Sequence, residues 1–452
     1  MHRRIAMSGL ALVATTAGML TGLSQSAYAS GGTIKVAYQQ YGANIAIPTL
    51  MKTAAAEFAK QYPGWTVSLN PIVAPENPYY TKLDLESSSA STAPDVLYED
   101  TFLVNTDVAG GYLQPMDSYL SGWPQWKLYS PAAQAAAKGA DGHVYGVSMG
   151  TDTRGLWYNK SLLKKAGVAV PWHPKSWADI VAAAEAIKKA DPGVTPMNVY
   201  SGVPTGEASS MQGFEMFLYG TNNWLYDFKT DKWEQAGAGW QSVLTTWQEL
   251  FSKGLAETPQ AASNPNNGAV VTETLLPEGK MAIDLDGSWV GSTWIKGGPA
   301  PWPQWKSTMA VAPMPTENGQ GQGDVSMSGG WLLSIGSHSK APAMAMDFIK
   351  IALDHANLLT YDIGAGQTAD RSDIATNPTY TASVPESAAF ASFVPFTHFR
   401  PAFANYSKLS NEIQLITGQV MTGQSTPAQG VAAYNKYLIG VVGKASTEAA
   451  PM

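Results

Sequence analysis

Segments with the polarity pattern of strands alternate with helical segments from one end of the chain to the other. Thr33–Tyr38 and Trp65–Leu69 alternate in polarity, as strands with one buried face do. Between them, Leu50, Ala54 and Phe58 recur four residues apart, which places them on one face of a helix. Such alternation predicts an α/β fold. The 452 residues suffice for two or three domains or for one large two-lobed unit.

Charge and residue usage exclude several classes of function. The chain has 28 basic and 35 acidic residues, a net charge of −7, and no basic run. No nucleic-acid partner is expected, because binding to phosphates needs clustered Lys and Arg. The absence of Cys excludes disulfides, thiolate metal sites and a Cys nucleophile. The six His are scattered and the common hydrolase and phosphate-loop motifs are missing, so we expect neither a metal site nor a cofactor.

Residues 1–29 have the pattern of a signal peptide. A basic start, His2–Arg4, precedes the apolar stretch Ile5–Leu23, and Ala27–Ala29 supplies the small-x-small pattern that a signal peptidase cleaves. A transmembrane anchor is the alternative, but polar and small residues interrupt the apolar stretch. Because the chain has no Cys to carry a lipid, we expect an exported, free periplasmic protein without a lipid anchor.

Carboxyl groups at strand ends are the residues that could act in catalysis. The predicted strand Asp95–Tyr98 ends in Glu99 and Asp100. Asp284 and Asp286 lie two apart in another predicted strand, so both point to one face. A glycosidase holds two carboxyl groups about 5–9.5 Å apart across the sugar bond. A secreted glycoside hydrolase that uses Asp284 or Asp286 with Glu99 is therefore an alternative to a protein that only binds hydroxyl groups.

Aromatic residues beside glycines or polar residues indicate a possible carbohydrate site. The chain has 15 Trp, and Tyr41, Trp289 and Trp331 stand at predicted loop or strand ends. Trp and Tyr rings cover the apolar face of a sugar ring, and acidic or Arg side chains bind its hydroxyls. A Trp at such a junction packs into a core just as readily. Both interpretations stay open on these residues alone.

A series of short motifs follows in a fixed order along nearly the whole mature chain. The motifs are Tyr62-Pro63-Gly64, Ala93-Pro94-Asp95-Val96, Gly111 to Asp117, Asp141 to Val147, Asp152 to Lys160, Lys165-Ala166-Gly167, Ser176-Trp177, Glu278 to Ala282, Gly287-Ser288-Trp289, Ala312 to Pro315 and Gly329-Gly330-Trp331. This series resembles the extracellular solute-binding proteins of carbohydrate ABC importers, which include maltose- and trehalose-type binding proteins. Asp141–Val147 is similar to the family's DGxxYGxP element, with Ser148 where Pro is usual.

The resemblance implies a periplasmic-binding-protein fold, in which a hinge joins two α/β lobes and the ligand binds in the cleft between them. Lobe one would take residues 33–150 and 309–360, and lobe two residues 151–308 and 361–452. Hinge closure would bring both lobes onto the ligand. The implied function is binding of a carbohydrate, a di- or oligosaccharide, and its delivery to a membrane permease, by a monomer without catalysis. A polyol or a sugar acid is an alternative ligand.

The resemblance also implies which residues contact the ligand. Asp100, with Glu99 beside it, and Asp152 would bind hydroxyls, and Trp289 would be a stacking platform. Gly330 and Trp331 would add backbone donors and a second ring. Arg371 stands where the family often has a hydroxyl-binding Arg, but this chain lacks the usual Pro there. The full predicted set is Tyr41, Asn44, Glu99, Asp100, Asp152, Arg154, Asp286, Trp289, Gly330, Trp331 and Arg371.

Overall fold

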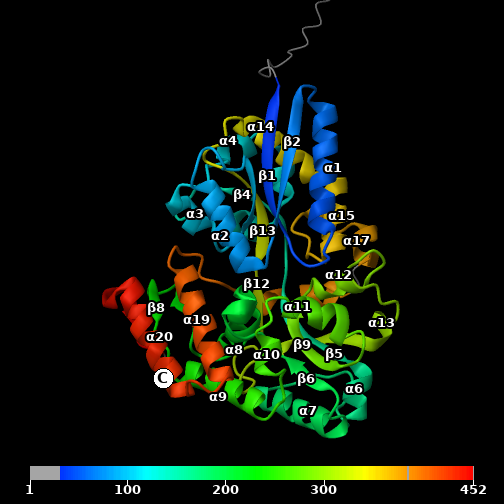
Figure 1. Cartoon of the computed structure of the whole chain (residues 1–452), viewed down its shortest axis with the longest axis vertical. Helices are drawn as coiled ribbons and strands as arrows, with labels where there is room; N and C mark the ends of the chain where they lie inside the picture. The colour runs from blue at the N-terminus through cyan, green and yellow to red at the C-terminus, as the bar shows by residue number, and fades with distance from the viewer. Residues whose placement is uncertain (1–30, 384–385, 451–452) are drawn as a thin grey trace, which may run out of the picture.

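The computed structural model describes residues 31–450 except 384–385, so the expected signal peptide lies outside the described residues. Two sheets form the centres of two lobes, stacked one above the other in Figure 1. In the described ranges, no helix combines the length and the apolar character needed to cross a membrane. The two-lobed α/β fold predicted from the sequence is confirmed.

The first lobe is built on a mixed five-stranded sheet. Its strands, in spatial order, are β2 (Trp65–Val73), β1 (Gly32–Gln40), β3 (Val96–Asp100), β13 (Gly330–Ile335) and β4 (Gly146–Thr151). The main helices around it are α1 (Ala46–Gln61), α2 (Glu76–Ser87), α3 (Val104–Gly110), α14 (Pro342–Ala352) and α15 (His355–Ala365). Leu50, Ala54 and Phe58 of α1 are buried, as their spacing predicts, and α1 packs on α14 and α15.

The second lobe is built on a four-stranded sheet. Its strands, in spatial order, are β10 (Met309–Ala312), β5 (Arg154–Asn159), β9 (Met281–Gly287) and β6 (Thr195–Asn198). Around it lie α7 (Trp177–Ala190), α9 (Ala238–Ser252), α12 (Val290–Trp294), α19 (Tyr406–Met421), α20 (Pro427–Val442) and the π-helical segment η3 (Ala208–Glu215). Ser176 caps α7 by accepting from the backbone N–H of Asp179, as its sequence predicts.

Smaller elements complete the lobes. One three-stranded sheet consists of β11 (Met314–Pro315), β12 (Asp324–Ser328) and β14 (Thr397–Phe399). A second consists of β15 (Thr447–Glu448), β8 (Lys232–Glu234) and β7 (Tyr226–Asp227). The short helices are α4 (Asp117–Leu120), α5 (Pro131–Ala136), α6 (Lys160–Lys165), α8 (Met216–Leu218), α10 (Pro259–Ala262), α11 (Asn267–Val270), α13 (Trp305–Thr308), α16 (Ser372–Ala375), α17 (Pro378–Ser383) and α18 (Ser387–Ala391).

Segments that cross between the lobes meet at one place. Thr151, at the end of β4, exchanges backbone hydrogen bonds of 2.7 and 2.9 Å with Thr368, beyond α15. Its hydroxyl lies 2.8 Å from the Ser328 hydroxyl and donates to the Gly329 carbonyl at 2.8 Å, between β12 and β13. These hydrogen bonds join three crossing segments side by side, which is the arrangement that a hinge requires.

Two of the expected lobe boundaries differ from the structure. Met309–Ala312 was expected to begin a return to the first lobe, but β10 pairs antiparallel with β5 in the second-lobe sheet. The return comes later, between β12 and β13. The expected boundary at 360/361 cuts through α15, which is one continuous helix packed on α1. The motif order along the chain could not locate these points, because strand pairing decides to which sheet a short segment belongs.

Candidate ligand-binding cleft

A cleft lies between the two lobes and has residues of both in its walls. Its main part encloses an empty volume of about 1050 Å³, and an adjoining part encloses about 920 Å³. Gln39, Tyr41, Glu76, Gln212 and Trp289 line both parts, so the two form one continuous space.

Most of the predicted ligand-binding residues come together in this cleft. The main part is lined by Tyr41, Asn44, Asp100, Asp152, Arg154, Trp289, Gly330 and Trp331. Asp286 lines the adjoining part, together with Tyr41, Asn44 and Trp289. They come from the loop after β1, the ends of β3 and β9, and the crossing segments beside β5 and β13. Positions up to 290 residues apart in the sequence thus form one site.

Two predicted residues do not line the cleft. Glu99 points away from Asp100 on the same strand and is 0% exposed; burial and the nearby Asp107 carboxyl raise the pKa of Glu99 well above its usual value. Arg371 is 1% exposed and donates to Asp373 at 2.7 and 3.0 Å and to the Leu353 carbonyl at 2.6 Å. The expectation that Glu99 and Arg371 face a ligand is therefore wrong.

Two tryptophans stand in the cleft with one ring face supported. Trp331, on β13, stacks on Tyr98 of the neighbouring strand, with ring centroids 4.2 Å apart and planes 4° apart. Trp289, just before α12, has the Arg154 guanidinium 4.8 Å from its ring centroid. Such stacking and cation–π contacts fix ring orientation. The sequence left open whether these rings belong to a core, and the structure shows that both pack against a core and also line the cleft.

Arg154 and Asp152 form a buried ion pair where the chain enters the second lobe. Arg154 Nη1 binds Asp152 Oδ1 and also donates to the Met327 carbonyl at 3.2 Å. Asp152 Oδ1 accepts a further hydrogen bond from the Gly329 backbone N–H at 3.0 Å. A solvent-exposed ion pair was the alternative for these residues, but both side chains are at most 7% exposed.

Asp286 lies where β9 ends at the adjoining part of the cleft. Its Oδ2 accepts from the Tyr200 hydroxyl at 2.7 Å and its Oδ1 from the Gly287 backbone N–H at 2.7 Å. Burial raises the pKa of Asp286 to about 6, against the effect of these hydrogen bonds. Asp284 points to the same face but lies deeper, where it accepts from Asn198 at 2.8 Å and does not line the cleft.

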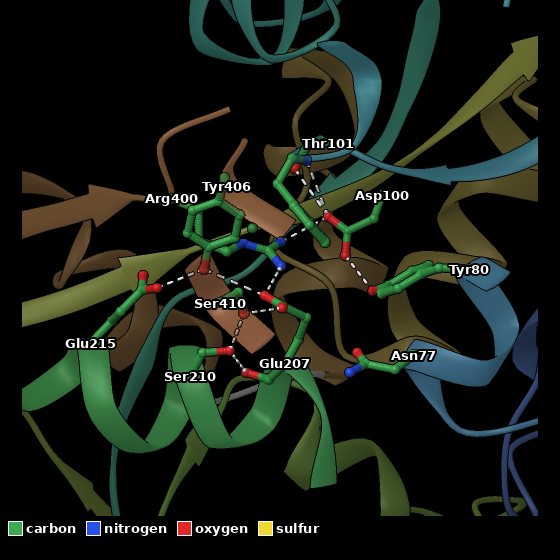
Figure 2. Close-up of polar contacts among 12 residues, drawn as sticks. Asn77, Tyr80, Asp100, Thr101, Glu207, Ser210, Glu215, Arg400, Tyr406 and Ser410 are labelled. Carbon is green, nitrogen blue, oxygen red and sulfur yellow. Dashed lines mark hydrogen bonds and ion pairs between the residues drawn. The ribbon is translucent and has the colours of Figure 1, made fainter. Parts of the chain in front are cut away.

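The sequence interpretation missed Arg400 and Glu207, which form the largest polar network of the site (Figure 2). Arg400 follows β14; its Nη2 donates to Asp100 at 2.7 Å and its Nη1 to Glu207 at 3.1 Å. The guanidinium lies 4.0 Å from the centroid of the Phe102 ring. Asp100 and Arg400 are 300 residues apart, and Arg400 belongs to none of the motifs that carry the resemblance.

Glu76 is a second residue that the sequence interpretation missed. It begins α2, directly after Pro75, and lines both parts of the cleft. Burial and the Asp100 and Glu207 carboxylates raise the pKa of Glu76 to about 8, while Arg400 acts in the opposite direction. The residue stands in a polar loop that the analysis of strand ends did not cover.

Residues 42–358 match the family model described as bacterial extracellular solute-binding protein. The chain belongs to this family. The match covers the second-lobe sheet, the first-lobe sheet except β1, and most of the cleft residues. The resemblance inferred from the motifs is therefore confirmed at the level of the family. Proteins of this family bind a solute, and the cleft between the two lobes of this chain is a suitable place for one.

Two solved structures share the fold of this solute-binding protein over more than nine-tenths of the chain, and a curated relative matches a shorter part. The GacH receptor of Streptomyces glaucescens GLA.O has a TM-score of 0.76 at 23% identity over 92% of this chain and 99% of that chain. Maltose-bound MalE3 of T. maritima has a TM-score of 0.76 at 20% identity over 91% and 100%. A binding protein of Brucella abortus (strain 2308) is 29% identical over 175 residues, which are 38% of this chain but only 40% of that relative.

Proposed function

We propose that this solute-binding protein binds a carbohydrate, a di- or oligosaccharide, in the cleft between its lobes and delivers it to the permease of an ABC importer. The observation that carries the proposal is the pair Trp289 and Trp331, two supported rings that line one cleft beside charged groups. Flat apolar rings and charge-assisted hydrogen-bond partners together suit the two kinds of surface that a sugar presents.

The similar structures favour the same class of ligand. The GacH receptor was solved with acarbose and with an acarbose homologue, and MalE3 with maltose. Those ligands belong to those proteins, and at 20–23% identity the ligand of this chain has to be inferred from its own side chains.

Catalysis finds no support in the cleft. The hydrolase alternative required Glu99 together with Asp284 or Asp286, on opposite sides of a sugar bond. Glu99 and Asp284 are both 0% exposed and line neither part of the cleft. We therefore propose a binding protein that returns its ligand unchanged. Export to the periplasm, release without a lipid anchor, a monomeric state and the division into hinged lobes are further parts of this proposal.

Titration calorimetry with glucose, maltose, maltotriose, cellobiose, xylobiose and mannobiose tests the proposal. We expect at least one di- or trisaccharide to bind with a Kd in the micromolar range and more tightly than glucose. Mannitol and gluconate represent the two alternative ligand classes, a polyol and a sugar acid. If either binds more tightly than every sugar, that class is the ligand in place of a carbohydrate. Product analysis after incubation with the tightest binder should return it intact. No binding to any of these compounds would contradict the proposed function.

A further inference from the structure

The carboxyl groups at the cleft differ in how many hydrogen-bond donors already reach them. Asp100 is surrounded by donors: the Arg400 guanidinium at 2.7 Å, the Phe102 backbone N–H at 3.3 Å and the Thr101 hydroxyl at 3.5 Å reach Oδ1, and the Tyr80 hydroxyl reaches Oδ2 at 2.8 Å. A carboxylate offers about four acceptor positions. Three of these donors share Oδ1 and one reaches Oδ2, so at most one position, on Oδ2, is left for a ligand hydroxyl.

Glu207 is equally occupied (Figure 2). Its Oε1 lies within hydrogen-bond distance of the Ser410 hydroxyl and of Gln414 Nε2, the latter at 3.3 Å. Its Oε2 lies 3.1 Å from Arg400 Nη1 and 3.4 Å from the Tyr406 hydroxyl. Four donors again meet about four acceptor positions. Glu207 therefore binds other protein side chains of the cleft wall and has no acceptor position left for a ligand hydroxyl.

Arg400 joins the carboxylates of Asp100 and Glu207 and, through them, the two lobes. The helix that follows Arg400, α19, packs on η3 and α9 of the second lobe, whereas Asp100 ends β3 of the first lobe. Further contacts cross on the same side: Asn105 donates to the Ala402 carbonyl, and the rings of Phe102 and Tyr406 meet edge to face at 5.4 Å. This group of contacts connects the two lobes directly.

Glu76 is the contrasting carboxyl. Within the described residues, its side chain has no hydrogen bond and no ion pair, although it lines both parts of the cleft. Asp152 and Asp286 are intermediate, with two donors each. Glu76 is partly exposed to the cleft, so its oxygens are open to hydrogen bonds from a ligand.

We propose that Glu76 is the carboxyl through which the first lobe recognises the ligand, and that Asp100 is a positioning residue that holds the lobes closed with Arg400 and Glu207. This assignment rests on the proposed function, because it concerns how the cleft contacts its ligand. It differs from the role that the family resemblance gave to Asp100. It makes Glu76 a specificity-determining residue.

The surroundings of Glu76 favour its neutral form. The charged and titratable groups that face it are Asp100, Glu207, Arg400, Arg154, Tyr41 and Tyr80. With a pKa of about 8, the carboxyl is mostly protonated at pH 7. A neutral carboxyl donates one hydrogen bond and accepts others, which matches the mixed donor and acceptor character of a sugar hydroxyl.

Three variants test the assignment: Glu76→Ala, Asp100→Asn and Asp373→Asn. The last is the control, because Asp373 also pairs with a buried arginine, Arg371, but within the first lobe. Binding is measured with the tightest binder among the six sugars named above. Interlobe distance is measured by single-molecule fluorescence on protein labelled through Lys82→Cys and Lys408→Cys, which the absence of native Cys permits. Both lysines are exposed, on α2 and α19.

We expect Glu76→Ala, which removes the donor and acceptor atoms, to weaken binding about tenfold, the usual consequence of losing about 1.4 kcal/mol, without changing the ligand-free distance distribution. Asp100→Asn should shift that distribution toward longer distances before any ligand is added, and Asp373→Asn should change neither quantity. Wild-type affinity in Glu76→Ala, or an unchanged distance distribution in Asp100→Asn, would overturn the assignment.

The two measurements separate failure of the assignment from failure of the proposed function. The distance distribution is recorded without ligand, so it decides the role of Asp100 whichever compound binds. If wild-type protein binds no sugar on the panel, the proposed function fails and the role of Glu76 fails with it. If a sugar binds and Glu76→Ala binds it equally well, only the assignment fails.

Discussion

Arg371 and Arg400 are both almost fully buried and both pair with carboxylates, yet they connect different parts of the molecule. Arg371 pairs with Asp373, two residues along the chain, and all its partners belong to the first lobe. Arg400 pairs with Asp100 and Glu207, which belong to different lobes. A buried arginine stabilises a lobe when its partners are local, and it influences closure when its partners lie across the cleft.

Arg371→Ala should produce the largest effect, a loss of stability. The substitution leaves the Leu353 carbonyl without its donor, whereas Asp373 is 30% exposed and keeps its contact with His355. Breaking a fully buried pair by removing one partner costs about 3–5 kcal/mol, and the exposure of Asp373 places the expected loss at the lower end, about 3 kcal/mol. Denaturant unfolding should show this loss in the free energy of unfolding. The folded fraction should keep wild-type affinity for the sugar, and a weakened affinity would show that Arg371 reaches the cleft after all.

Arg400→Ala should act mainly on closure and binding. It leaves Asp100 and Glu207 as unpaired carboxylates that face each other across the cleft, but the lobes can relieve this by opening toward water. Because the ligand binds the closed form, the apparent affinity falls by the fraction that remains closed. We expect a loss of about 100-fold, or about 2.7 kcal/mol, in titration calorimetry. A loss of stability as large as that of Arg371→Ala, with unchanged affinity, would reverse the comparison.

The sequence predicted the fold and most of the cleft, because these depend on local patterns. The alternation in Thr33–Tyr38 and the helical spacing of Leu50, Ala54 and Phe58 reappear as β1 and α1. Residues at strand ends, such as Trp289 and Trp331, lie in the cleft for the same reason. In an α/β sheet, the ends of neighbouring strands meet at one edge.

The same patterns could not separate Arg371 from Arg400 or Asp100 from Glu76. The roles of Asp100 and Arg400 depend on a hydrogen bond between residues 300 positions apart, which no local pattern of the sequence shows. Glu99 shows the limit at shortest range: it is adjacent to Asp100, but successive side chains of a strand point to opposite faces, so Glu99 is buried behind the sheet. The polarity of the two side chains predicted contact with the ligand for Glu99 and Asp100 alike.

Trp331→Ala and Trp289→Ala should each weaken sugar binding about tenfold. Stacked aromatic pairs contribute about 0.5–1.5 kcal/mol beyond the area they bury, and a sugar face gains a similar contact. Trp331→Phe should recover part of the loss, since Tyr98 still supports the smaller ring. Trp224→Ala is the control, because Trp224 is 37% exposed and does not line the cleft. Equal affinity in both cleft variants would remove the observation that carries the proposed function.

The pH dependence of binding should give the smallest effect and the most specific one. Glu76 has a pKa of about 8 in the ligand-free protein, far above its ordinary value, because burial and two neighbouring carboxylates disfavour its charge. If the ligand uses the neutral carboxyl, affinity stays constant below this pKa and falls as pH rises through it. The protonated fraction predicts a loss of about twofold at pH 8 and about tenfold at pH 9, relative to pH 7.

Titrations of wild type and Glu76→Gln at these pH values check this, since the amide cannot ionise and its affinity should stay level. An affinity that rises with pH in wild type alone would mean that the ligand binds the ionised carboxyl, and the neutral form would then be the wrong one. A decline of the same size in both proteins would show that a group other than Glu76 titrates. The ion pairs of Arg400 with Asp100 and Glu207 would then remain the main feature that distinguishes Arg400 from Arg371.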